Sequence, residues 1–400
     1  MAGLYIHIPF CASRCIYCGF YSTTHLDLRQ RYVDAVCREM ETHPFPLPEG
    51  MGIDTVYLGG GTPSQLTIPQ LRQLFIYINK VYSLPSIQGG AGGGSEVTIE
   101  VNPDDVTAEY AEALPQLGIN RVSMGAQTFD DARLRFLHRR HTAAQVPVAV
   151  QRLRDAGIHN ISIDLMYGFP NETLADWQHD IDAVLALNVE HLSAYCLMIE
   201  EGTPLAKMMR SGDCPSCEER SGLQGDCPLN EELEREMYEL LIDRLTGAGY
   251  EHYEISNFAR SGFRSRHNSS YWHDIPYIGL GAAAHSYTIP DGFAIGSSPV
   301  RSWNTADIHE YISAINEGNI PCEREVLDPD THYNDRITTA LRTSDGLDLT
   351  TLMEGHRRHC LHEAEPFLKN DLLKLTGSRL VLTRRGLFVS DMVMSQLMMV

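Results

Sequence analysis

The chain has 400 residues, of which 43% are hydrophobic, and a formal net charge of -20. This length allows a full core and roughly two or three domains, and the acidic balance argues against sequence-independent nucleic-acid binding, which needs a basic surface. No apolar stretch reaches about 18 residues, so no transmembrane helix is expected, and the short apolar segment 4–10 does not resemble a secretory signal. We therefore expect a cytoplasmic protein with no nucleic-acid partner, and peripheral contact with a membrane stays open.

Six short apolar runs predict buried strands separated by amphipathic helices. The strands are expected at 4–8, 54–58, 96–101, 121–124, 160–166 and 191–195, and the helices near 27–42, 66–82, 107–116, 143–156 and 173–187. This alternation predicts an α/β fold with a parallel sheet and right-handed crossovers, either a partial (β/α)6 barrel or an open doubly wound sheet. In both architectures ligands gather at the carboxyl ends of the strands.

The rest of the chain divides less regularly. Residues 86–95 are Gly/Ser-rich, which predicts a mobile surface loop. Residues 211–230 carry three cysteines. These cysteines form an extra metal or redox site, or they are free thiols. A helix is expected at 231–247, then helices near 333–342, 348–355 and 360–374 and a strand–turn–strand at 379–389, which together indicate a small helical, winged-helix-like domain. The three cysteines are Cys214, Cys217 and Cys227, and the expected divisions are 1–210, 211–325 and 326–400.

Three cysteines near the N-terminus have a spacing that predicts an iron–sulfur cluster. Cys11, Cys15 and Cys18 form the pattern C-x3-C-x2-C. Three thiolates bind three irons of a [4Fe–4S] cube, which leaves the fourth iron for a small chelate such as the methionine part of S-adenosylmethionine (SAM). Electron transfer to the sulfonium would then release a 5′-deoxyadenosyl radical. The alternative is a zinc site, for which His7 would supply the fourth ligand.

Residues suited to hold a ligand follow the second to fifth predicted strands. Glycines let backbone groups approach a ligand closely, and a carboxylate at a strand end accepts both hydroxyls of a ribose. Helix capping or an internal ion pair explains such carboxylates and amides equally well, and Arg139 faces either a ligand carboxylate or a surface acid. The strand-end residues are Gly60, Gly61, Thr62, Glu100, Gln127 and Asp164.

Six segments together resemble the coproporphyrinogen III dehydrogenase-like branch of radical SAM proteins. They are YIHIPFCxxxCxxCxF, YLGGGTPS, EVNP, SMGAQTF, LHRRH and SIDLMYGFP, within residues 4–290. The branch contains oxygen-independent coproporphyrinogen III oxidases and haem chaperones of the HemW type. The oxidases carry a further cysteine where this chain has Phe20, and an N-terminal extension. The chain also contains HNSSYW at 267–272, which is similar to the HNxxYW motif of the HemW type.

The resemblance implies cofactors and site residues. It implies a (β/α)6 barrel with a C-terminal helical domain, a [4Fe–4S] cluster on Cys11, Cys15 and Cys18, and no catalytic residue beyond the cofactor sites. By motif, Tyr5, Gly60, Thr62 and Glu100 would contact the cluster-bound SAM. The positions that match a second SAM site in the oxidases are Tyr17, Gly61, Gln127, Arg139 and Asp164.

The resemblance also implies haem binding and transfer to haem-requiring apoproteins. A haem needs an axial ligand, an apolar slot and partners for its propionates. His267 is a candidate ligand, Asn268 would orient it or donate to a propionate, and Tyr271 and Trp272 would supply flat walls; the residues themselves are equally consistent with a hydrogen-bonded histidine beside packed aromatics. The alternative functions are the oxidase, a radical decarboxylation in porphyrin synthesis, and a haem-degrading relative.

Overall fold

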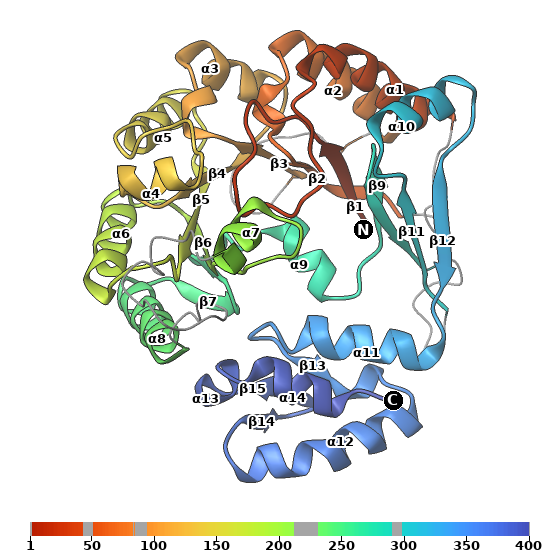
Figure 1. The fold of residues 1–400 in the computed structure, drawn as a ribbon. Coiled ribbons are helices and arrows are strands. Elements are labelled where there is room, and N and C mark those ends of the chain that lie inside the picture. The colour runs from red at the N-terminus through yellow and green to blue at the C-terminus, as the bar shows by residue number, and fades with distance from the viewer. Residues whose placement is uncertain are drawn as a thin grey trace.

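The computed structural model describes residues 2–42, 51–82, 84, 94–211, 231–289 and 298–399. In its first half, six strands alternate with helices, as the sequence predicts (Figure 1). The strands are β1 (Ala2–Ile8), β2 (Ile53–Gly60), β3 (Glu96–Val101), β4 (Arg121–Gln127), β5 (Asn160–Tyr167) and β6 (His191–Cys196). The helices are α1 (Arg29–Thr42), α2 (Ile68–Tyr82), α3 (Ala108–Gln116), α4 (Asp131–Phe136), α5 (Gln145–Asp155), α6 (Leu174–Ala186) and α7 (Pro204–Ser211).

These six strands pair in parallel and in chain order, so that all their carboxyl ends open at one edge. Further strands extend the sheet on both sides to twelve, in the order β12-β11-β10-β9-β1-β2-β3-β4-β5-β6-β8-β7. The added elements are α8 (Glu231–Gly247), β7 (Glu251–Glu254), β8 (Asn257–Ala259), α9 (Arg266–Trp272), β9 (Tyr277–Leu280), β10 (His285–Thr288), β11 (Val300–Asn304), α10 (Ile308–Asn316) and β12 (Cys322–Val326). The sheet curves around a central space with α1–α6, α8 and α10 on its outer side, while α7 and α9 are seen over the centre (Figure 1). This arrangement confirms the predicted partial barrel.

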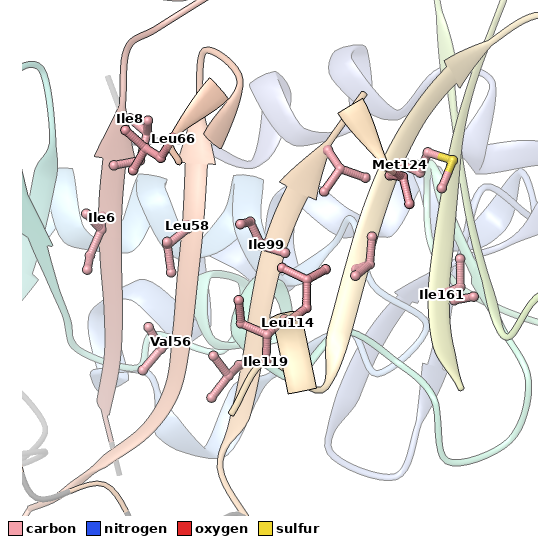
Figure 2. Packing of buried hydrophobic residues seen from close by; sticks show 14 of the residues in the cluster. Ile6, Ile8, Val56, Leu58, Leu66, Ile99, Leu114, Ile119, Met124 and Ile161 are labelled. Carbon is pink, nitrogen blue, oxygen red and sulfur yellow. The ribbon is translucent and has the colours of Figure 1, made fainter. Parts of the chain in front are cut away.

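Alternation along the strands decides which side chains enter the barrel. In β1, Leu4, Ile6 and Ile8 are fully buried against the outer helices, so Tyr5 and His7 point into the lumen. Figure 2 shows Ile6 and Ile8 in the apolar layer with residues of the neighbouring strands and of α3, where the labelled members are Val56, Leu58, Leu66, Ile99, Leu114, Ile119, Met124 and Ile161. The apolar outer layer therefore fixes the sheet and leaves the polar residues for the interior.

The C-terminal part has its own apolar core and a three-stranded sheet. It contains α11 (Pro329–Ala340), β13 (Leu347–Asp348), α12 (Glu354–Lys369), β14 (Leu373–Thr376), β15 (Arg379–Leu382), α13 (Arg384–Leu387) and α14 (Ser390–Leu397). Two predicted details are wrong. Residues 348–355 form the end of a strand, a short 3-10 turn and the start of α12, not a separate helix; the hairpin lies at 373–382, because Leu373 begins a strand and Gly377 makes the turn at φ +61°.

Other expectations fall partly or wholly outside the described residues. The Gly/Ser-rich loop at 86–95 is described only at its last two residues, and Cys214, Cys217 and Cys227 lie in a range that the structure does not describe. Among the helices in the described ranges, none combines the length and apolar content that a membrane crossing requires.

Candidate functional site

The loop after β1 carries the three clustered cysteines at the open edge of the barrel. Ile16, in the middle of the loop, is buried with Leu137, Leu197 and Leu205, and its backbone carbonyl accepts a hydrogen bond from Leu205 at 3.0 Å. This packing anchors the loop at the edge of the cavity. Cys11, Cys15 and Cys18 are all free thiols and line one cavity.

A turn after β2 stands beside this loop. Gly60 adopts φ +111°, and a Cβ there would lie 2.6 Å from the His7 ring, so only glycine fits. At Gly61 a Cβ would lie 2.7 Å from the backbone of Pro9. The Thr62 hydroxyl donates to the Cys11 sulfur, with 3.5 Å between the oxygen and the sulfur. The turn thus presents backbone groups to the cavity directly next to the cysteines.

Glu100, at the end of β3, is the carboxylate nearest that turn. It accepts hydrogen bonds from the Tyr57 phenol at 2.7 Å and from the Gly60 backbone N–H at 3.2 Å. Burial raises its pKa to about 7, against the lowering effect of the Tyr57 hydrogen bond. A carboxylate at this position has free acceptor capacity toward the cavity that it lines.

Arg139 crosses the cavity wall between the cysteines and β4. Its guanidinium lies 3.7 Å from the Cys15 thiol and donates to the Asn102 side chain at 2.7 Å and to the Gly125 carbonyl at 2.5 Å. Its Nε is buried and has no partner among the described residues. Gln127 follows a register shift in β4 and adopts φ +68°, a conformation that a residue other than glycine rarely keeps without a compensating role.

Asp164, on β5, and Tyr17, in the cysteine loop, complete the predicted SAM residues of the cavity. Ser123 donates to the Asp164 carboxylate at 3.1 Å, and burial raises the pKa of Asp164. Burial likewise raises the pKa of the Tyr17 phenol, which therefore stays neutral. The structure gathers every predicted cluster and SAM residue except Tyr5 around this one space.

The cavity has a volume of about 1480 Å³ and continues from the cysteines to the C-terminal part of the chain. Its distal wall combines apolar and aromatic side chains with carboxylates of α8 and of the C-terminal part, and several arginines border it. The apolar and aromatic wall residues are Met166, Tyr167, Tyr195, Met198, Tyr238, Phe388 and Met392, and the distal arginines are Arg235, Arg342 and Arg385. Pockets for a single small ligand usually have about 300–1,000 Å³, so the space exceeds what one cofactor fills.

The HNxxYW residues lie away from this cavity. Helix α9 packs near the amino ends of β1 and β2, and His267 is 1% exposed. Its Nδ1 hydrogen-bonds with Thr55 at 2.8 Å and its Nε2 with Tyr271 at 2.8 Å. Tyr5 stacks against the same ring, with centroids 6.5 Å apart.

The other members of the motif also have structural neighbours. The Trp272 ring lies 5.3 Å from the Arg342 guanidinium. The Asn268 backbone N–H donates a hydrogen bond at 3.3 Å to the hydroxyl of Ser265, the residue that caps the helix. None of the HNxxYW side chains that the sequence predicts as haem contacts borders the described cavity.

The zinc alternative depends on His7, and its ring is already engaged. His7 Nδ1 hydrogen-bonds with the Tyr5 phenol at 3.0 Å and Nε2 with the Tyr21 carbonyl at 3.1 Å. Within the described ranges, no three His, Cys, Asp or Glu side chains converge on a point where one ion would bind. Three separated thiols around a shared space fit a polynuclear cluster better than a single ion.

Several residues of the barrel interior and of the cavity escaped the sequence analysis. In the sequence, Tyr57 looks like an ordinary strand residue. Because neighbouring side chains of a strand point to opposite faces and Leu58 faces the outer helices, Tyr57 points into the barrel, two residues before the glycines. Phe388 and Met392 belong to the C-terminal part, and nothing local in the sequence indicates that they face the barrel mouth.

The sequence matches the Radical SAM superfamily over residues 5–184 and the HemN C-terminal domain over residues 327–389. It is 34% identical over 362 residues to the Bacillus subtilis protein named "Heme chaperone HemW", covering 90% of this chain and 88% of that protein. It is 31% identical over 401 residues to the Mycobacterium tuberculosis protein of the same name, covering 99% and 94%. The chain belongs to the HemW family.

A solved structure supports the architecture. The fold matches that of coproporphyrinogen III oxidase (HemN) from Escherichia coli, a radical SAM enzyme, with a TM-score of 0.78 and 22% identity over 99% of this chain and 89% of that one. At this identity the likeness concerns the fold alone. It confirms the predicted α/β radical SAM barrel with a C-terminal domain, while the exact boundaries at 210 and 325 stay predictions.

Membership of the radical SAM superfamily supports a [4Fe–4S] cluster and SAM as cofactors of this HemW-family chain. The residues present fit both groups. Three thiols free of disulfides line one space, the Gly60–Gly61 turn has no room for side chains, and the buried Arg139 Nε has no hydrogen-bond partner within the described ranges. When bound, the pair supplies reductive cleavage of a sulfonium.

Proposed function

We propose that this chain binds haem in the distal part of the cavity and transfers it to haem-requiring apoproteins, as the name of its relatives suggests. Cys11, Cys15 and Cys18 hold the [4Fe–4S] cluster in this proposal, and the strand-end residues hold SAM. The observation that carries it is the cavity itself, because the space continues beyond the cysteines and the strand-end residues to a wall that contains aromatic side chains, methionines and arginines.

The distal wall has the chemistry that a haem requires. Met198 and Met392 are 67% and 53% exposed, so their thioethers are accessible to a ligand in the cavity that they line. Met, Cys, Tyr and His are the side chains that ligate haem iron, and Met166, Met198 and Met392 line this space. Arg385 has no ion-pair partner in the described part of the chain and is placed to receive a propionate.

A haem titration of anaerobically reconstituted protein tests the proposal. Met392→Glu puts a charge on the proposed haem surface, and we expect it to weaken haem binding at least tenfold, the equivalent of about 1.4 kcal/mol. Leu375→Glu is the matched control, since Leu375 is 50% exposed on β14 and does not border the cavity. Equal Soret titrations for both variants and wild type would remove haem from this cavity.

Transfer is measured in the same preparation by mixing haem-loaded protein with apomyoglobin and following the Soret shift. Product analysis after incubation with coproporphyrinogen III, SAM and a reductant tests the alternative activity. Vinyl products would overturn the chaperone proposal in favour of an oxidase.

A further inference from the structure

Three aromatic rings form a stack on the floor of the barrel. The Tyr57 and His267 rings are stacked with centroids 5.1 Å apart and an interplanar angle of 24°. Tyr5 stacks on Tyr57 at 6.2 Å and on His267 at 6.5 Å. These separations lie within the range of favourable aromatic contacts, so the three rings fix one another's positions.

The stack leads directly to the SAM end of the barrel by two routes. The Tyr57 phenol donates to Glu100 at 2.7 Å. The Tyr5 phenol hydrogen-bonds with His7 at 3.0 Å, and the His7 ring fills the space where Gly60 lacks a side chain. Both routes converge, because the Gly60 N–H donates to the second oxygen of Glu100 at 3.2 Å.

His267 is the fixed end of the stack. Thr55, near the start of β2, and Tyr271 bond its two ring nitrogens, and its backbone N–H donates to Glu96 at the start of β3 at 3.0 Å. Burial lowers the pKa of His267 to about 3, so the ring is neutral at physiological pH. A buried, neutral imidazole with a hydrogen bond at each ring nitrogen acts as a rigid platform.

We propose that His267 is a positioning residue for SAM, whose ring supports Tyr57 so that the Tyr57 phenol holds the Glu100 carboxylate toward the nucleoside. The HNxxYW segment thereby links α9, at the amino ends of the strands, to the cofactor at their carboxyl ends. This inference goes beyond haem transfer and does not depend on it; it depends only on SAM binding beside Glu100.

Four variants of the full chain separate the platform from general stability. Tyr57→Phe removes the phenol but keeps the ring. His267→Gln removes the ring but keeps a hydrogen-bonding group for Thr55, whereas His267→Phe keeps a flat ring. His191→Gln is the matched control, because His191 is equally buried in the barrel and bonded to Ser162 and Tyr253 without touching Tyr57 or Glu100.

The readout is the pH dependence of SAM affinity, measured by equilibrium dialysis with anaerobically reconstituted protein, together with thermal unfolding. The Glu100 carboxylate is the form that accepts ribose hydroxyls, so affinity rises as pH passes its pKa of about 7. Besides Tyr57 and the Gly60 N–H, Glu100 faces Asp164, which raises this pKa, and Arg121, which lowers it. The SAM amine titrates identically in every variant, so differences between variants report the protein.

Loss of the Tyr57 hydrogen bond raises the pKa of Glu100 further. We expect Tyr57→Phe and His267→Gln to move the midpoint upward by about one pH unit, the low end of what a charge-assisted hydrogen bond contributes. His267→Phe and His191→Gln should keep the wild-type midpoint, whatever they do to the melting temperature.

Three results would overturn the proposal. The first is a wild-type midpoint in His267→Gln with a lowered melting temperature, which would make His267 merely structural. The second is a shift in His191→Gln equal to that in His267→Gln. The third is a shift of the pH midpoint in His267→Phe as large as the shift in Tyr57→Phe. If His267→Gln does not fold, the comparison of His267→Phe with Tyr57→Phe decides. Haem titration of the same preparations is a separate readout, so failure of the haem proposal is distinguishable.

Discussion

A buried carboxylate on α1 ties together four distant elements, and its removal gives a sharp prediction. Glu39 is 0% exposed and accepts hydrogen bonds from the Tyr311 phenol at 2.6 Å, the Asn304 side chain at 2.8 Å and the Gly281 backbone N–H at 2.9 Å. These partners lie on α10, at the end of β11 and just after β9. The carboxylate therefore joins α1 to the β9–β11 extension of the barrel.

Glu39→Gln keeps the shape but places an NH2 group where an acceptor is needed. The Asn304 amide cannot turn to accept it, because its NH2 also donates to the Gly281 carbonyl at 2.9 Å. The hydrogen bonds from Tyr311 and Gly281 lose their charge assistance, at about 1 kcal/mol each. The third is lost, because the new NH2 group of Gln faces the NH2 group of Asn304. Relief of carboxylate desolvation offsets part of this, so we expect a net loss of about 2–4 kcal/mol.

The assay is thermal unfolding of the barrel followed by circular dichroism, where this loss lowers the melting temperature by roughly 3–6 °C. Glu41→Gln is the matched control on the same helix, since Glu41 is exposed and only pairs with Lys80, a type of contact worth about 0–1 kcal/mol. A Glu39→Gln protein as stable as Glu41→Gln would refute the reasoning and show that the native site holds a neutral carboxylic acid.

Three further predictions concern the cluster, the glycine turn and pH. Anaerobically purified protein should be brown with about four irons per chain, and Cys15→Ala should lose the brown absorbance and the bound iron; unchanged iron content would exclude Cys15 as a ligand. Gly60→Ala should weaken SAM binding and destabilise the fold more than Gly157→Ala, because Gly157 shares a positive φ of +90° but has open space around its Cα; equal melting temperatures would contradict the close approach of His7. Burial raises the pKa of Glu172 from its ordinary value of 4.5 to about 7, so between these pH values the folded state keeps a proton on Glu172 that the unfolded state releases. Wild type should therefore lose up to about 3 kcal/mol of stability relative to Glu172→Gln between these pH values, and a pH-independent difference in urea unfolding would refute this.

The strand positions could be predicted because each buried strand leaves a short apolar run, and the parallel order follows from the helices between them. The same logic found Gly60, Glu100 and Asp164, since side chains at successive strand ends meet at one edge. The β12 strand escaped prediction because its sequence, CEREV, has three consecutive charged residues. It lies at the exposed edge of the sheet and has no apolar face.

Contacts between residues that are far apart in the sequence could not be predicted from local sequence patterns. Glu39 meets Tyr311 across 272 positions, and the His267 backbone meets Glu96 across 171. His267 itself shows why: next to aromatic residues in a helix, a histidine has the same local pattern whatever it contacts across the barrel. Its neighbours Thr55 and Tyr57 on β2 are visible only in the folded chain, and its role as a haem ligand stays a prediction.

The barrel and the C-terminal part share the cavity of the proposed function. His267 and Tyr57 are buried and stacked in the barrel interior, whereas the cysteines and strand-end residues line the cavity. Phe388 and Met392 of the C-terminal part line the same cavity. In the proposed function, haem would therefore contact both parts of the chain, because the residues proposed to hold it come from β5, the segment after β6, α8 and the C-terminal part.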